Sequence, residues 1–126
     1  MEMNARLALT LAGIFMFAAV ALGAFGAHAL KGQLDPAMTA VWQSAVQYHA
    51  WHALALLGLG SLMLHWPEKR GLGLAAWLFA SGIVLFAGSL YAVALTGLRG
   101  LGLITPFGGL AFLAGWAVLA WTARRP

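Results

Sequence analysis

The stretch Gln43-Ser44-Ala45-Val46-Gln47-Tyr48-His49-Ala50-Trp51-His52 decides how the rest of this chain is interpreted. It is the one place where several polar side chains run directly into a long apolar segment, and the segments around it are typical of lipid-facing helices. At helical spacing Tyr48 and His52 lie on one stripe, and His49 lies beside His52. We therefore expect a helix with a polar face at the entrance to an apolar span.

The composition of the chain excludes an ordinary soluble domain. Of its 126 residues, 63% are hydrophobic and only 8% are charged, whereas a soluble domain usually carries about 25% charged residues. The chain has no cysteine, which excludes disulfides, thiolate metal sites and cysteine nucleophiles. Its net charge of +4 comes from basic residues scattered at segment ends, a pattern of membrane topology and not of nucleic-acid binding.

The apolar runs predict an all-α fold, an integral membrane four-helix bundle made by a single transmembrane domain over residues 1–126. The spans are expected at about 7–30, 45–65, 72–95 and 104–122. Residues 36–48 would form an interfacial helix start that either lies flat on the membrane or continues the second span. The first run exceeds the 7–15 apolar residues of a signal peptide, so we interpret it as a retained helix.

Two helix starts and the distribution of charge complete this topology. Asp35-Pro36 and Thr105-Pro106 each combine a capping side chain with a proline suited to the first helical position. Four spans put both termini on one side of the membrane. Basic residues on that side outnumber those on the other by five to two, which predicts cytoplasmic termini: Arg6, Lys69, Arg70, Arg124 and Arg125 against Lys31 and Arg99.

Small and aromatic residues suggest how the helices pack. Gly23, Ala27, Gly88 and Gly109 are candidate positions for close helix approach, because small side chains let membrane helices come together. Most of the six tryptophans lie near segment ends and are expected to anchor at the membrane surface. Among them, Trp42 is expected at headgroup level.

Three stretches together resemble a known family. They are Gly23-Ala24-Phe25-Gly26-Ala27-His28-Ala29-Leu30, Tyr48-His49-Ala50-Trp51-His52-Ala53-Leu54, and Gly88-Ser89-Leu90-Tyr91 continuing to Leu95-Thr96-Gly97, followed by Ile104-Thr105-Pro106-Phe107-Gly108-Gly109 and Gly115-Trp116. In this order they are similar to the small bacterial inner-membrane family called domain of unknown function 423. The resemblance covers nearly the whole chain. It implies a four-helix integral membrane protein without an assigned activity, so it carries no catalytic residues over.

Histidine in apolar surroundings is the sharpest chemical signal. A candidate ligand site near the outer leaflet comprises His28, Gln47, Tyr48, His49, His52 and Tyr91. Imidazoles there could hydrogen-bond between helices, hold a small ligand or relay a proton, or bind a metal or haem. No carboxylate accompanies them to orient an imidazole, as metal sites usually require. We therefore favour structural hydrogen bonding and predict no metal and no cofactor.

The acids Glu2, Asp35 and Glu68 all fall at predicted ends or loops, so proton-coupled export has no carboxylate inside the membrane to use. No catalytic constellation is present, and we predict that the protein is not an enzyme. The sequence favours a structural or accessory component of the inner membrane, with the lipid bilayer and a homo-oligomer or larger membrane complex as partners. The alternative is a binder of a lipid- or quinone-like apolar ligand at the histidine and tyrosine side chains.

Overall fold

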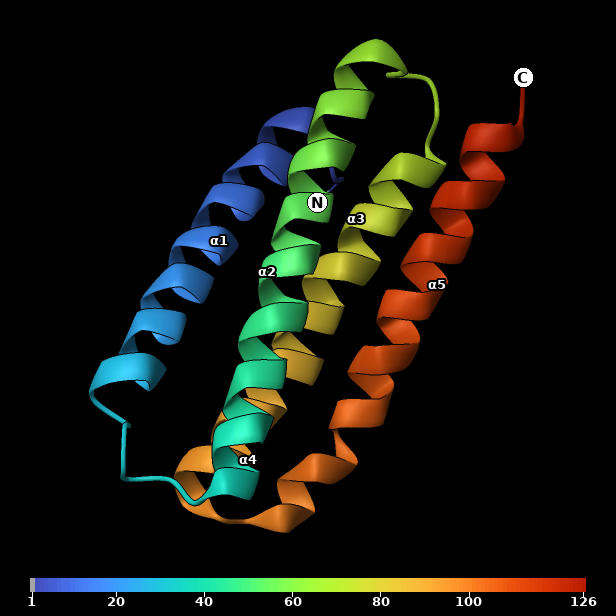
Figure 1. The fold of residues 1–126 in the computed structure, drawn as a ribbon. Coiled ribbons are helices and arrows are strands. Elements are labelled where there is room, and N and C mark those ends of the chain that lie inside the picture. Colours follow the sequence, from blue (N-terminus) through green and yellow to red (C-terminus); the bar gives the residue numbers. More distant parts are fainter. Residues whose placement is uncertain (1) are drawn as a thin grey trace.

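The computed structural model describes residues 2–126 and is all-helical. In chain order its elements are α1 (Ala5–His28), α2 (Pro36–His65), α3 (Gly71–Gly82), a π-helical segment (Ile83–Ala87), α4 (Gly88–Thr96), a 3₁₀ helix (Arg99–Leu103) and α5 (Thr105–Arg124). Because α3, the π-helical segment and α4 follow one another without a break, they form one long stretch. This stretch packs with α1, α2 and α5 into a bundle (Figure 1).

Length and composition support a membrane location. Three stretches are long and apolar enough to cross a bilayer: Ala5–His28, Gly71–Thr96 and Arg99–Arg124. The 30 residues of α2 exceed each of them in length but include more polar side chains. This helix is the central one, and it packs against α1, α3, the π-helical segment and α4. The imidazoles of His49 and His52 are buried inside the bundle, which keeps these two polar side chains of α2 away from lipid.

The start of α2 has the structure that its sequence predicts. Asp35 is the N-cap, and its carboxylate accepts a hydrogen bond from the Met38 backbone N–H at 2.7 Å. Pro36 is the first helical residue, where its missing N–H leaves no hydrogen bond unmade. The helix then runs on to His65 as one element, so residues 36–48 continue the second rod.

The buried core joins all four rods, because it includes Phe112 of α5 beside residues of α1, α2 and the α3 rod. Its largest fully buried side chains are Leu56 and Leu59 of α2 and Leu72 and Phe79 of α3. Alanines supply the contact from α1, which brings that backbone close to α2: Ala8, Ala12 and Ala19 are all buried. α1 therefore packs against α2 through these small side chains.

The connection from α4 to α5 is short and ordered. Gly97 ends α4 with a φ of 72°, a conformation that glycine adopts without strain, and a 3₁₀ helix follows. The sequence predicts that Thr105 caps α5, but the structure shows no such cap. Ile104 is the N-cap residue, no side chain caps this end, and the Thr105 hydroxyl bonds to Ser89 instead.

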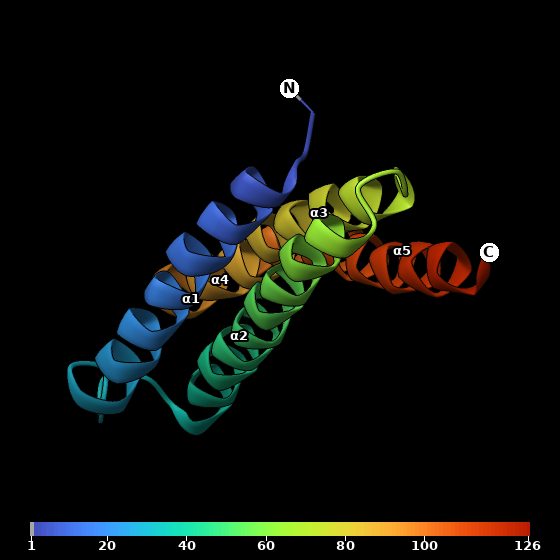
Figure 2. The ribbon, with the colours of Figure 1, turned by 90° about the horizontal axis from the view of Figure 1, so that it is seen from above.

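A lysine joins the α2–α3 turn to the end of the chain. The Lys69 ammonium group donates hydrogen bonds to the carbonyl oxygens of Thr122 and Arg125, at 3.3 and 2.8 Å. These carbonyls lie at the C-terminus of α5, where a cation also interacts favourably with the helix dipole. The same ammonium lies 4.5 Å from the centre of the Trp66 ring. The turn and the C-terminus therefore share one end of the bundle, and α1 and α5 lie on opposite sides of the molecule (Figure 2).

Candidate functional site

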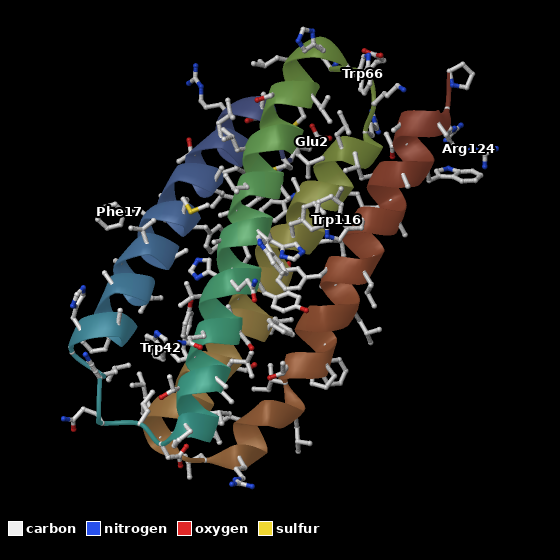
Figure 3. The ribbon with its side chains drawn as sticks, in the orientation of Figure 1. Glu2, Phe17, Trp42, Trp66, Trp116 and Arg124 are labelled. Atoms are coloured by element: carbon white, nitrogen blue, oxygen red, sulfur yellow. The ribbon has the colours of Figure 1, made fainter. Side chains whose placement is uncertain are left out.

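His52 is held by hydrogen bonds at both ring nitrogens. Its Nδ1–H donates to the Tyr48 carbonyl oxygen one turn earlier in α2, at 2.7 Å. A carbonyl can only accept, so Nδ1 carries the proton and Nε2 is left as an acceptor. Nε2 accepts a hydrogen bond from the Trp116 indole N–H of α5 at 3.0 Å, and the Trp116 side chain projects between the two helices (Figure 3). The neutral imidazole therefore links α2 to α5 with no unused polar atom.

Aromatic rings enclose this imidazole. Phe112 stacks on His52 with 3.6 Å between ring centroids, and Phe79 meets it edge-on at 5.3 Å. Tyr48 lies parallel to His52 on the same helix and packs against Phe86 at 4.8 Å. Only 4% of His52 is exposed, which leaves no route for a ligand to either ring face.

His49 makes the corresponding link from α2 to α4. Its Nδ1 and the Tyr91 hydroxyl are 2.9 Å apart. Nε2 is buried without a hydrogen-bond partner. The backbone of Phe15 approaches the ring from α1, but it lies outside strict hydrogen-bonding geometry. Nδ1 of this imidazole therefore has a hydrogen-bond partner, and Nε2 has none.

Trp42 bridges α2 to α1. Its indole N–H donates to the Leu22 carbonyl oxygen at 3.0 Å, and its ring lies 4.7 Å from that of Tyr91. With 3% of its surface exposed, its ring is buried against α1. Its side of the helix therefore decides its surroundings, and its depth in the membrane stays a prediction. Glycine makes room for the ring, because a Cβ at Gly26 would overlap the indole.

The π-helical segment brings the third rod against α5. The backbone of Gly108 lies so close to that of Phe86 that a Cβ on the glycine would overlap the Phe86 N and Cα. The Ser89 hydroxyl donates to the Phe86 carbonyl oxygen at 3.0 Å, which satisfies a group at the end of the irregular turn. Thr105 extends this contact to the start of α5 through its hydrogen bond with Ser89. Such π-helical turns occur often at functional positions of membrane and soluble helices.

The structure separates the residues that the sequence grouped into one ligand site. His49, His52 and Tyr91 lie inside the bundle, and Tyr48 is partly exposed at its surface. His28 at the end of α1 and Gln47 on α2 are exposed. Within residues 2–126, no three His, Cys, Asp or Glu side chains come close enough to hold a metal ion. The three imidazoles of the hypothesis therefore do not converge.

The candidate packing residues also differ in their surroundings. A Cβ at Gly23 would meet Val46 of α2 at 3.3 Å, so this glycine is a contact position. Ala27 is exposed beside α2. A Cβ at Gly88 would meet nothing within 4 Å, and one at Gly109 would make only ordinary contact with Phe86. The closest approach of α5 falls at Gly108, one residue before the predicted position.

Sequence reasoning missed the partners of His52, namely Phe112 and Trp116. Trp116 is preceded by Gly115 and lies in the middle of the fourth span, far from either end. That position was the available signal, since a tryptophan in mid-span lies too deep for interfacial anchoring. Its polar N–H then requires a partner inside the protein.

Comparison with known proteins finds relatives of this sequence. A family model described as "Protein of unknown function (DUF423)" matches residues 22–109. The UPF0382 inner membrane protein YgdD of Escherichia coli is 42% identical over 129 residues, covering 98% of this chain and 93% of its own. The UPF0382 membrane protein YwdK of Bacillus subtilis is 44% identical over 108 residues, covering 83% and 85%. No solved structure matches the chain.

Proposed function

Because the chain belongs to the DUF423 family, whose named relatives are membrane proteins, we propose that it is a structural or accessory component of the bacterial inner membrane or of a larger membrane complex. In this proposal the protein is not an enzyme. It contributes a rigid apolar surface on which another membrane protein, or a second copy of the chain, packs.

The observation that carries the proposal is the use of His52. Within the described chain, this buried imidazole is bonded at both nitrogens to groups of its own bundle. Ser89 and Thr105, and likewise Trp42 and Leu22, also bond across helices. Intramembrane polar side chains usually indicate a transport or catalytic path. Here they join helices, which supports a structural role.

The outer surface supplies the second argument. Large apolar side chains project from α1 and α5, on opposite sides of the bundle, with Phe17 78% exposed (Figure 3). In a bilayer such faces meet lipid or other helices, and association there depends on packing and not on hydrophobicity alone. The faces suited to partners are those of α1 and α5: Ile14, Phe17 and Val20, and Phe107, Leu110 and Leu113.

We further propose that α2 crosses the membrane with the other three rods and that both termini are cytoplasmic. At 30 residues α2 is about 45 Å long, ample for a hydrocarbon core of about 30 Å. Its two buried histidines, His49 and His52, are accommodated because neighbouring helices surround them. The basic residues of the α2–α3 turn and of the C-terminus share one end, the arrangement that the positive-inside rule assigns to the cytoplasm.

Photocrosslinking in intact membranes tests the partner surface. A photoreactive amino acid is introduced singly at exposed Phe17 and Leu113, and at Leu56, which is fully buried, as the matched control. We expect discrete crosslinked products from at least one exposed position and none from position 56. Mass spectrometry of the product distinguishes a second copy from another membrane protein. If the exposed positions give only lipid adducts and unchanged monomer, the accessory role is wrong.

A further inference from the structure

Two grooves run along the same side of the α1–α2 hairpin. The one near the α1–α2 loop has a volume of about 670 Å³ and carries polar side chains from both the loop and α2. The one farther along has a volume of about 710 Å³ and an almost wholly apolar lining. Trp42 lines the first and Phe17 the second (Figure 3). Each volume falls within the range of small-ligand sites.

Helical spacing shows that the two grooves lie end to end along one stripe of each helix. On α1, the residues lining them recur every three or four positions: Leu9, Gly13, Met16, Val20, Gly23 and Ala27. On α2, Thr39, Gln43 and Gln47 line the first groove, and Leu54 and Leu57 line the second on the same face of the helix.

The length and polarity of this combined groove suit an acyl chain that carries a polar headgroup. From Thr39 to Leu57 is 18 residues, or about 27 Å of helix, compared with about 30 Å for a hydrocarbon core. With its polar end at headgroup depth, its apolar end therefore extends beyond the midplane. Small residues of α1 keep it open, since a Cβ at Gly13 would meet nothing within 4 Å.

Charge selects the occupant. Lys31 lines the polar end together with the hydroxyl of Thr39 and the amides of Gln43 and Gln47. No carboxylate is among the lining residues, and Asp35 nearby accepts the hydrogen bond that caps α2. A cation with neutral donors fits a phosphate, and ammonium groups bind phosphates as point charges.

We propose that this groove is a specific binding site for an anionic phospholipid. Its phosphate lies at Lys31 and the glutamine amides, and one acyl chain follows the apolar lining past Phe17 toward Leu57. A second copy in the same orientation fits less well. Its acid nearest to Lys31 is Asp35, which already caps α2, and its Glu2 and Glu68 lie at the other end of the bundle. This site lies apart from His49 and His52, and the proposal goes beyond the accessory role.

Lipid titration of the purified, delipidated protein tests the site. Native mass spectrometry measures binding of phosphatidylglycerol and of phosphatidylcholine with identical acyl chains. We expect one tightly bound phosphatidylglycerol per chain and at least about tenfold weaker phosphatidylcholine. Lys31→Ala should remove most of this preference, since Lys31 is exposed and its loss leaves the core intact.

A pair of glycine substitutions tests the acyl position. Gly13→Leu places a side chain in the groove, whereas Gly58→Leu is the control, because its Cβ also meets nothing within 4 Å but lies outside the lining. We expect Gly13→Leu to weaken phosphatidylglycerol binding about tenfold or more and Gly58→Leu to leave it unchanged. Circular dichroism checks that both variants fold, and if Gly13→Leu does not, the Lys31→Ala result decides.

Three outcomes overturn the proposal. The first is equal binding of the two lipids by the wild-type protein. The second is equal loss of binding in the two glycine variants. The third is a wild-type dimer that Gly13→Leu converts to monomer, which would make a second copy the occupant of the groove. Phe17 lines the groove, but Leu113 of α5 does not. A crosslink from position 113 therefore tests the accessory role independently, and the lipid site can fail while that role stands.

Discussion

The indole N–H of Trp116 in α5 donates to Nε2 of His52 in α2, across 3.0 Å and 64 residues of sequence. This bond sets the rotation of α5 relative to the central helix. It also requires the neutral imidazole, because Nδ1 already donates to the Tyr48 carbonyl oxygen. The hydrogen bonds that join α2 to α5 therefore require the neutral His52 tautomer with its proton on Nδ1.

Replacing Trp116 with phenylalanine tests this bond. The variant keeps an aromatic ring but leaves Nε2 of His52 without a donor, so we expect a loss of about 1 kcal/mol in the free energy of unfolding. Steric-trapping or denaturant titration in bicelles measures the change. Trp121→Phe is the matched control, because that ring is exposed on the same helix and its replacement should have little effect. Equal losses would assign the effect to ring size and not to hydrogen bonding.

A double-mutant cycle tests the link between His49 and Tyr91. Each single change, His49→Phe or Tyr91→Phe, leaves one partner of the 2.9 Å contact unsatisfied and should cost about 1 kcal/mol. The double variant removes both polar groups, including the unpartnered Nε2. We expect it to be more stable than the sum of the single losses by at least about 0.5 kcal/mol. Strict additivity would argue against an energetic bond.

The close approach of α5 to the π-helical segment gives a comparison of neighbouring residues. Gly108→Ala should destabilise the bundle by about 1–3 kcal/mol, because its Cβ would overlap the Phe86 backbone and neither helix can shift cheaply. Gly109→Ala should be almost neutral, since its Cβ would make contact at 3.9 Å. Thermal unfolding in a mild detergent distinguishes them. Similar melting temperatures for the two variants would contradict the tight packing.

Membrane orientation can be measured directly, because the chain contains no cysteine. Gln33→Cys places one thiol in the exposed α1–α2 loop, and Glu68→Cys places one in the exposed α2–α3 turn. With cytoplasmic termini, a membrane-impermeant maleimide added to intact spheroplasts should label position 33 and not position 68. Permeabilised cells provide the control in which both are labelled. The reverse pattern would invert the topology.

The sequence was sufficient to predict features that depend on local chemistry. The all-helical membrane architecture follows from the apolar runs, and the cap of α2 follows from the dipeptide Asp35-Pro36. Both arise from groups within a few residues of one another. Thr105-Pro106 carries the same local signal, yet the Thr105 hydroxyl bonds to Ser89. A tertiary partner was available there, and it replaced the local one.

Features that depend on helix rotation could not be predicted in the same way. Trp42 lies near the start of a span, and only the position of α1 shows that its indole faces the Leu22 carbonyl. The pairing of His52 with Trp116 requires the relative rotation of two helices, which the packing of the whole bundle determines. For the candidate ligand residues, sequence spacing places Tyr48 and His52 on one stripe of α2, but it does not show which neighbours cover each side chain.

The π-helical turn at Ile83–Ala87 acts as one extra amino acid accommodated within an otherwise regular rod. Each residue of an α-helix advances its angular phase by about 100°. Deleting a single residue from this turn would therefore swing Tyr91 about a quarter of the way round its axis, off the His49 imidazole that it now meets. The π-helical turn thus sets the direction in which each side chain of α4 points. A one-residue deletion here would therefore disturb the fold more than the same deletion in an aqueous loop.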